Sequence, residues 1–358
     1  MTGSIRDYGM VPGHLPTGPR NKISDVAGVT VGHCTVDQGD YHTGVTVILP
    51  GQDNPFFHKY TAACYVHNGF GKTCGLIQIE ELGTLESPIA LTSTLNVGKV
   101  QDALLEYLLD RCRREGQAPR SINPVVGECN DGRLSRIAGR PVGQREVLAA
   151  IGSATPDFQL GAVGAGRGTI CYGFKGGIGS ASRVLSLGDK SFTLGVLVQT
   201  NFGAPGDLRI LGKPAPNPQH IQLPVACDAG SVMVILATDL PLSSRQLRRV
   251  LRRCGVGLAR TGSYLGHGSG EIMIGFTTAN RIPSAENPFL PLTILREDLL
   301  DPVFEAAAEA TEEAVLSSLW AAESLTGYTG LYVPSLREVL FPSAAGEDLR
   351  VSPPPKGR

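Results

Sequence analysis

Residues 227–238 read CDAGSVMVILAT, and they join two segments of very different character. Upstream, residues 204–229 show no regular pattern and contain five prolines. Downstream, residues 232–237 form a continuous apolar run, which is typical of a buried strand. A structureless stretch of that length is uncommon inside a compact domain and is usually functional. We interpret the Gly230–Ser231 junction either as a turn into a core strand, or as a bond that is cleaved so that Ser231 becomes a new N-terminus.

The composition excludes several classes of protein. The chain has 358 residues, 42% hydrophobic residues and a formal net charge of −1 with both signs scattered, so neither a nucleic acid nor a membrane surface is expected as a partner. The first residues contain no apolar signal-peptide region, and no window of 18 apolar residues predicts a transmembrane helix. The eight cysteines form no C-x-x-C pair, and there is no H-E-x-x-H motif. We therefore expect a reduced cytoplasmic chain with no disulfide framework, no metal site and no cofactor.

The glycine-rich segments do not predict a nucleotide site. Residues 69–73 resemble the end of a phosphate-binding loop, but Val66 stands where that loop needs glycine. Residues 161–182 contain many glycines without the G-x-G-x-x-G spacing of a dinucleotide site. A hairpin or a cleft lined by backbone is the better interpretation of this second segment.

The pattern along the chain predicts a layered α+β fold. We expect strands at residues 26–36, 43–49, 61–66, 125–129, 192–200, 231–238 and 272–276. Amphipathic or Pro-initiated helices are expected at residues 97–114, 144–151, 243–260 and 301–324. Strands and helices do not alternate one for one, which favours mixed or antiparallel sheets with helices outside. Residues 1–22 are rich in glycine and proline and are expected to be an arm.

Serine chemistry is the strongest candidate activity. A serine hydroxyl needs a base, and the chain has no G-x-S-x-G nucleophile elbow. Cleavage before Ser231 would create an α-amine that titrates near ~7.7–8.0, which suits a general base. Ser269 and Glu271 are two residues apart in an extended segment and could polarise Ser231. A glycine turn with an exposed Glu271 is the simpler alternative.

Three further polar residues follow predicted strands. Asn201 stands at a strand end before a glycine and is a candidate donor to an oxyanion, or a turn-starting amide. Glu128 and Asn130 lie at the end of another strand and could line a pocket. Asn-Asp-Gly at residues 130–132 is also ordinary turn chemistry.

The chain resembles the family of L-aminopeptidase/D-Ala-esterases (DmpA) and β-peptidyl aminopeptidases. The similarity spans roughly residues 11–345, and the matching stretches are residues 41–46, 68–72, 81–91, 126–132, 230–242 and 268–271. The resemblance implies a four-layer αββα sandwich of the N-terminal-nucleophile type. It implies a single domain, residues 1–358, cleaved into an α chain 1–230 and a β chain 231–358. It also implies a homo-oligomer, commonly a tetramer of αβ pairs, that acts on small peptides, amino acid amides or esters.

The resemblance also implies roles for individual residues. Ser231 corresponds to the nucleophile, with Ser269 and Glu271 as its polarising partners. Asn201 corresponds to the oxyanion donor, and Glu128 to a carboxylate that receives the free ammonium of the substrate.

One position departs from the family pattern, which places a tyrosine hydroxyl beside the oxyanion. Residues 128–137 contain no tyrosine and offer Arg133, so Tyr65 and Tyr172 are the other candidates.

Two other functions share this fold. One is an acetyl transferase of the ornithine acetyltransferase type, which would use an N-terminal threonine in place of Ser231. The other is an unprocessed scaffold without activity.

Overall fold

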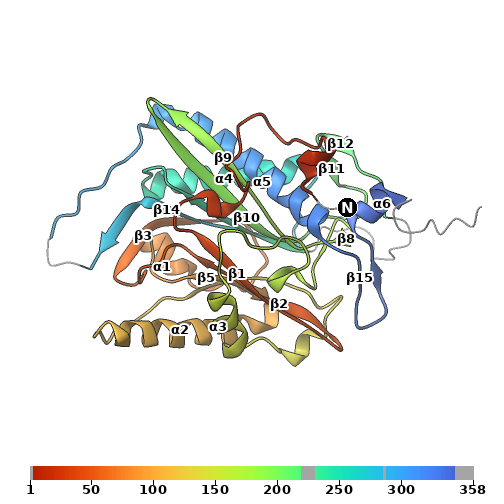
Figure 1. Cartoon of the computed structure of the whole chain (residues 1–358), viewed down its shortest axis with the longest axis horizontal. Helices are drawn as coiled ribbons and strands as arrows, with labels where there is room; N and C mark the ends of the chain where they lie inside the picture. The colour runs from red at the N-terminus through yellow and green to blue at the C-terminus, as the bar shows by residue number, and fades with distance from the viewer. Residues whose placement is uncertain (1–2, 219–229, 285–287, 343–358) are drawn as a thin grey trace, which may run out of the picture.

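The computed structural model describes residues 3–218, 230–284 and 288–342. Two sheets lie face to face in this structure, and each has helices on its outer face (Figure 1). The layers run from α2 and α3 through the smaller sheet and the larger sheet to α4 and α5. The predicted αββα sandwich is confirmed.

The smaller sheet has the strand order β1-β2-β5-β6. Its strands are β1 (Thr30–Gln38), β2 (Tyr41–Leu49), β5 (Ile89–Ser93) and β6 (Val125–Cys129). The first three pair antiparallel, and β6 pairs parallel with β5. Its outer face is covered by α2 (Val97–Arg114) and α3 (Gln144–Gly152). The predicted helix over residues 97–114 is confirmed, and its apolar stripe is buried against the sheet.

The larger sheet has the strand order β4-β3-β14-β13-β10-β9. Its strands are β4 (Thr84–Leu85), β3 (His58–Gly69), β14 (Gly270–Pro283), β13 (Ser231–Thr238), β10 (Lys190–Asn201) and β9 (Ile178–Leu187). Only the central β13–β14 pair is parallel. The outer helices are α4 (Ser244–Arg260) and α5 (Asp301–Ala321). Ser243 caps α4 by accepting a hydrogen bond from the backbone of Gln246, as the sequence predicted.

Shorter elements complete the described chain. They are the helices α1 (Leu76–Leu82) and α6 (Leu336–Leu340), and the strand pairs β7 (Ile170–Cys171) with β8 (Phe174–Lys175), β11 (Arg209–Ile210) with β12 (Lys213–Pro214), and β15 (Leu325–Thr326) with β16 (Tyr332–Val333). Single 3-10 turns lie at Ile5–Tyr8, Ile23–Asp25, Thr94–Asn96, Ile137–Gly139, Gly164–Gly166 and Glu297–Leu299. The β11–β12 pair lies within residues 204–229, for which no regular structure was predicted; residues 219–229 lie outside the described part. Among the described helices, none is both long and apolar enough to span a bilayer.

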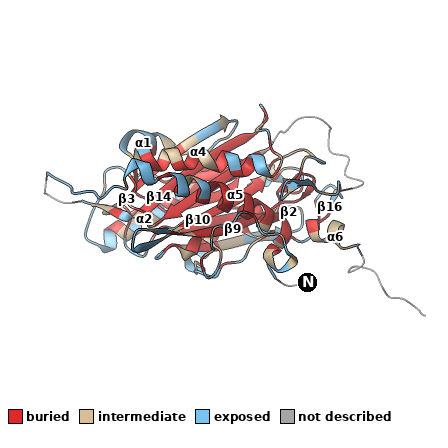
Figure 2. Ribbon diagram, turned by 90° about the horizontal axis from the view of Figure 1, so that it is seen from above, coloured by how far each residue is buried: buried red, intermediate tan, exposed pale blue. Residues whose placement is uncertain are grey.

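Strand β13 lies between β14 and β10 in the larger sheet, and all eight of its residues are buried. Its labelled neighbours β14 and β10 are also largely buried (Figure 2). Val232, Val234 and Leu236 face α4 and α5, whereas Met233 and Ile235 face the smaller sheet. Both faces of the strand therefore meet apolar layers. This burial on both faces explains why residues 232–237 are all apolar, whereas apolar and polar residues would alternate in a strand with one exposed face.

The N-terminal residues are docked on this sandwich through a buried ion-pair network. Arg183 on β9 is fully buried, and its guanidinium lies 2.8 Å from Glu309 and 2.8 Å from Glu313 on α5. Arg183 also donates to the carbonyl of Pro12 at 2.8 Å, and Glu309 accepts from the backbone of His14 at 2.9 Å. The described part of the predicted arm, residues 3–22, is therefore docked on the core, where its backbone satisfies charges that the core buries.

The same contacts set the ionisation of Glu309. Burial alone would raise the pKa of this carboxyl, but hydrogen bonds from Arg183 and from the backbone of His14 and Leu15 outweigh it and lower the pKa. A carboxyl whose folded-state pKa is lowered stabilises the fold above its unfolded pKa of about 4.3. That stabilisation is lost as the pH falls through the lower, folded-state value.

Replacing Arg183 tests this network. Arg183→Gln leaves Glu309 without its buried cation and Glu313 with Arg6 alone, and we expect the free energy of unfolding at neutral pH to fall by about 3–5 kcal/mol. Urea denaturation at pH 7 measures the loss. Arg145→Gln is the matched control, because its side chain is 92% exposed while it pairs with Glu146, and we expect a loss below about 1 kcal/mol. Equal losses in the two variants would contradict this account.

Candidate active site

Ser231 is the first residue of the central strand β13 and is 5% exposed. Its register partners are Asn201 on β10 and Gly270 on β14. Asn201 ends β10 and Gly270 begins β14, so the three residues meet at one edge of the larger sheet. Ser269 and Glu271 flank Gly270 in sequence. The structure thus brings Ser231, Asn201, Ser269 and Glu271 to one place, although they come from segments far apart in the chain.

Gly230 fits its position only because it has no side chain. A Cβ at this residue would lie 2.1 Å from the carbonyl oxygen of Asn201 and 2.8 Å from Cα of Phe202. The carbonyl of Gly230 accepts a hydrogen bond of 3.0 Å from the backbone N–H of Gly270. The peptide bond between Gly230 and Ser231 is therefore held between β10 and β14, with a backbone donor on its carbonyl oxygen.

The carboxamide of Asn201 has a defined orientation. Its Oδ1 accepts a hydrogen bond of 3.1 Å from the backbone N–H of Ile170. A backbone N–H can only donate, so this contact fixes which end of the amide is oxygen. The Nδ2 end of the amide therefore points away from Ile170. Asn201 and Ser231 are paired on neighbouring antiparallel strands, so their side chains lie on the same face of the sheet with close Cβ atoms. Asn201 is thus placed beside Ser231 with an amide donor to offer.

Ser269 and Glu271 are both fully buried. The alternative of an exposed Glu271 is therefore wrong. The Ser269 hydroxyl has no hydrogen-bond partner among the described residues, and a buried polar group in that state calls for an explanation. Ser231 is in register with Gly270, so these two positions lie on one face of the sheet. Glu271 is in register with Val232, and both lie on the opposite face, which packs against α4 and α5. Glu271 consequently approaches residue 231 from the side opposite to the Ser231 hydroxyl.

Asn68 holds the segment that carries Ser269. Its Nδ2 donates to the carbonyls of Gly266 at 2.9 Å and His267 at 3.2 Å, and it also donates to the carbonyl of Ser269. Sequence reasoning gave Asn68 no role, although it lies in one of the stretches that resemble the aminopeptidases. Asn68 lies near the end of β3, and the sequence does not show that its side chain donates to a loop 198 residues away.

Glu128 lies at the end of β6 and is 4% exposed. Its Oε1 accepts from the backbone N–H of Lys72 at 2.9 Å, and its Oε2 accepts from the Thr94 hydroxyl. The next residue, Cys129, donates its thiol to the carbonyl of Ser231 at 3.5 Å. Glu128 is thus anchored next to a residue that contacts Ser231. An ionised carboxylate has about four acceptor sites, so these two donors leave room for a third.

Asn130 and the tyrosine candidates are placed differently. Asn130 is exposed, and its Oδ1 accepts from the N–H of Gly132 at 2.9 Å, which is the turn interpretation. Arg133 is exposed as well, whereas Tyr172 is fully buried and hydrogen bonds through its hydroxyl to Thr261 at 2.9 Å. Tyr65 lies on β3 with Arg252 over its ring. Asn130 therefore has the turn role, and the Tyr172 hydroxyl already has Thr261 as its partner.

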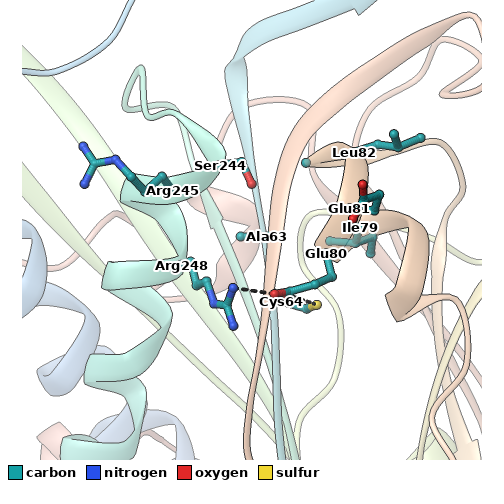
Figure 3. A pocket seen from close by; sticks show the side chains of 10 residues that line it. Ala63, Cys64, Ile79, Glu80, Glu81, Leu82, Ser244, Arg245 and Arg248 are labelled. Atoms are coloured by element: carbon teal, nitrogen blue, oxygen red, sulfur yellow. Dashed lines mark hydrogen bonds and ion pairs between the residues drawn. The ribbon is translucent and has the colours of Figure 1, made fainter.

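Two other features of the described chain are not part of this site. A cavity of about 360 Å³ lies between α1 and α4, with Glu80 paired to Arg248 at its wall (Figure 3). Its strand residues, Ala63 and Cys64, are in register with Gly275 and Ile274, well beyond Glu271 along β14. The cavity therefore lies away from the end of the sheet that carries Ser231.

A cluster of His14, Glu305 and Glu309 has metal-like spacing. Both oxygens of Glu309 already accept hydrogen bonds from His14, Leu15 and Arg183. The cluster is better described as part of the network that docks the N-terminal residues than as a metal site.

Comparison with known proteins gives a consistent result. Residues 21–333 match the profile of peptidase family S58. A β-peptidyl aminopeptidase of Sphingosinicella xenopeptidilytica is 39% identical over 348 residues, which cover 90% of this chain and 86% of that protein. The structure of L-aminopeptidase D-Ala-esterase/amidase from Ochrobactrum anthropi, a variant of the Ntn hydrolase fold, is 36% identical with a TM-score of 0.87, covering 96% of this chain and 99% of that one. A protein of Pyrococcus horikoshii is 42% identical with a TM-score of 0.87, covering 93% and 96%.

Asn68 offers a test of how the site is held together. Asn68→Ala leaves three carbonyls of residues 266–269 without their shared donor, and we expect the free energy of unfolding to fall by about 1–3 kcal/mol. Asn130→Ala is the control, because within the described residues the Asn130 side chain accepts a hydrogen bond from Gly132 in its own exposed turn. Urea denaturation compares the two variants, and a larger loss for Asn130→Ala would show that Asn68 does not stabilise the loop.

Proposed function

The chain belongs to peptidase family S58 and is an aminopeptidase, and from this premise we propose that it processes itself at Gly230–Ser231 and then uses Ser231 as its nucleophile. The observation that carries the proposal is the register of the larger sheet. Asn201, Ser231 and Gly270 are aligned across three strands, with Ser269 and Glu271 on either side of Gly270. Each role that a serine acyl transfer requires has a candidate within this group.

Self-processing starts from the intact bond. The Ser231 hydroxyl attacks the carbonyl carbon of Gly230, and the C–N bond to Ser231 breaks as its nitrogen takes up a proton. The product is an ester between Gly230 and the Ser231 oxygen, which water hydrolyses to release both chains. The N–H of Gly270, 3.0 Å from the Gly230 carbonyl oxygen, supports this step because it can donate to the oxyanion that forms there.

In the processed enzyme, Ser231 carries a free α-amine that serves as its general base. The hydroxyl attacks the amide carbon of the first residue of the substrate, and Asn201 donates from Nδ2 to the oxyanion. Ser269 and Glu271 act on the new amine. The buried hydroxyl of Ser269, which has no hydrogen-bond partner among the described residues, supports this assignment, because the amine adds a hydrogen-bonding group beside it. The amide C–N bond then breaks, and the leaving amine takes the proton that the α-amine accepted from the hydroxyl. Water hydrolyses the resulting acyl-enzyme and regenerates Ser231.

Glu128 is proposed to receive the free ammonium of the substrate. Its carboxylate is buried and anchored by Lys72 and Thr94, so its position is set before the substrate binds. An ion pair between Glu128 and the substrate ammonium forms only if the first residue of the substrate has a free amino group. This requirement makes the enzyme act at the N-terminal residue. The substrate class is a small peptide, amino acid amide or ester. The relative from Sphingosinicella is named for β-peptidyl substrates, and we propose β-amino acid amides as the first to be assayed.

The homo-oligomer and the cytoplasmic location stay predictions of the sequence. Exposed apolar side chains, such as Ile77 and Leu82 on α1, give a described surface on which copies of the chain can meet. Size-exclusion chromatography with light scattering measures the oligomeric state.

Ser231→Ala tests processing and catalysis together. We expect this variant to run as one chain of full length by denaturing mass spectrometry and to release no p-nitroaniline from alanine p-nitroanilide. Ser191→Ala, which changes an exposed serine of β10, should give two fragments split after residue 230 and full activity. A processed and active Ser231→Ala protein would sink the proposal. Acetyl transfer from acetyl-ornithine by the wild-type protein would instead favour the transferase alternative.

Glu128→Gln tests recognition of the substrate ammonium. The amide keeps an acceptor for the Lys72 N–H but loses the charge, and we expect kcat/KM to fall by about tenfold to a hundredfold. The exposed Glu81→Gln serves as the control and should keep the wild-type kcat/KM. An unchanged kcat/KM in Glu128→Gln would assign the ammonium to another group.

A further inference from the structure

The β7–β8 hairpin packs against the end of β10 that carries Asn201. Its turn residues, Tyr172 and Gly173, both have positive φ, 54° and 81°, which is the geometry that two-residue hairpins prefer. The N–H of Tyr172 donates to the carbonyl of Phe202 at 2.9 Å, and a Cβ on Gly176 would lie 2.6 Å from the carbonyl of Thr200. The hairpin therefore contacts the residues on both sides of Asn201.

Lys175, the last residue of β8, is fully buried in this hairpin. Its Nζ donates to three backbone carbonyls, those of Gly166 at 2.9 Å, Thr169 at 2.9 Å and Gly176 at 2.7 Å. Carbonyl oxygens can only accept, so three such contacts require the three N–H groups of an ammonium. Burial lowers the pKa of Lys175 well below its usual value of 10.5, and the three carbonyls favour the charged form against that effect.

One of these carbonyls belongs to the peptide unit that orients Asn201. The carbonyl of Thr169 accepts from Lys175 Nζ, and the N–H of Ile170 in the same unit donates to Asn201 Oδ1 at 3.1 Å. A cation at the oxygen end of a peptide polarises the whole unit and strengthens the hydrogen bond that its N–H donates. A continuous chain of hydrogen bonds thus runs from Lys175 through this peptide to Asn201.

We propose that Lys175 is a positioning residue for the oxyanion donor: its ammonium polarises the Thr169–Ile170 peptide, which fixes the Asn201 amide and strengthens its donation from Nδ2. This inference rests on the proposed role of Asn201 in the function above. Lys175 itself touches neither the substrate nor Ser231 in this account. Its effect is expected on the transition state, in which charge develops on the oxyanion, and not on binding of the ground state.

A double-mutant cycle separates this role from a structural one. Processed wild type, Lys175→Gln, Asn201→Ala and the double variant are assayed with alanine p-nitroanilide. We expect Lys175→Gln to lower kcat by about tenfold to a hundredfold while KM changes by less than about twofold. In the Asn201→Ala background, the same lysine change should alter kcat by less than about twofold, because the residue through which it acts is gone.

Arg183→Gln is the matched control, because Arg183 is an equally buried cation that is not linked to Asn201 in the described contacts. Whatever change it makes in kcat should be the same in both backgrounds. The proposal is overturned if Lys175→Gln keeps the wild-type kcat, or if its effect is as large without Asn201 as with it. Either result leaves the proposed function intact as long as the wild type is processed and active. An active Ser231→Ala variant, by contrast, would overturn the function itself.

A second variant keeps the inference testable if Lys175→Gln does not fold. Ile170→Pro removes the N–H that reaches Asn201 while both Lys175 and Asn201 remain in place. We expect kcat to fall by about tenfold with little change in KM. A folded and processed Ile170→Pro enzyme with the wild-type kcat would show that the peptide does not act on Asn201, and the proposal would fail.

Discussion

The geometry of the candidate site depends on the parallel pairing of β13 with β14. It aligns Ser231 with Gly270, so that a serine and the Ser269–Glu271 segment meet although 38 residues separate Ser231 from Ser269. A parallel pair needs a crossover connection, and α4 supplies it by packing on the outer face of the larger sheet. The antiparallel strand β10 then adds Asn201 from the other side. The apolar run of β13 therefore does more than fill the core. Because the strand is buried on both faces, its register with its neighbours is fixed, and that register brings these polar residues together.

That edge of the sandwich holds several buried polar groups. Ser269, Glu271, Lys175 and Asp131 are all buried there or in the adjoining hairpin and turn. Burial raises the pKa of Asp131 to about 6, although Ser93 donates to one of its oxygens. Burying such groups costs stability, and the apolar layers on both sides of the larger sheet offset that cost. Polar groups that are buried and held by hydrogen bonds are already oriented before any substrate arrives, which is the condition for strong electrostatic stabilisation of a transition state.

The layers could be predicted from the sequence because periodicity reports directly which faces of an element are buried. The apolar stripe of α2 and the Ser243 cap of α4 predicted the ends of these two helices to within a residue or two. The apolar composition of β13 indicated that both of its faces are buried. Strand register and the partners of single polar atoms are not encoded in that way, because they depend on tertiary packing. The sequence around Asn68 does not show which distant carbonyls its amide contacts. Lys175 was hidden by its glycine-rich surroundings, where a lysine is normally solvated; only the fold shows that three carbonyls replace water around its ammonium.

The intact bond also bears on what the processed site accepts. If Ser231 first attacks the carbonyl of Gly230 and later that of a substrate, then Gly230 occupies the position that the first residue of the substrate takes afterwards. The surroundings of Gly230 describe that position: the carbonyl of Asn201 lies on its Cβ side, and the N–H of Gly270 lies on its carbonyl oxygen. An L-residue that copied the glycine backbone there would bring its Cβ to 2.1 Å from the carbonyl oxygen of Asn201, so its backbone would have to shift. A residue with an extra methylene between its carbonyl and its side chain moves the bulk one atom further out. If Gly230 marks the position of the acyl residue, this contact is a steric reason to compare β-amino acid amides with alanine p-nitroanilide as substrates.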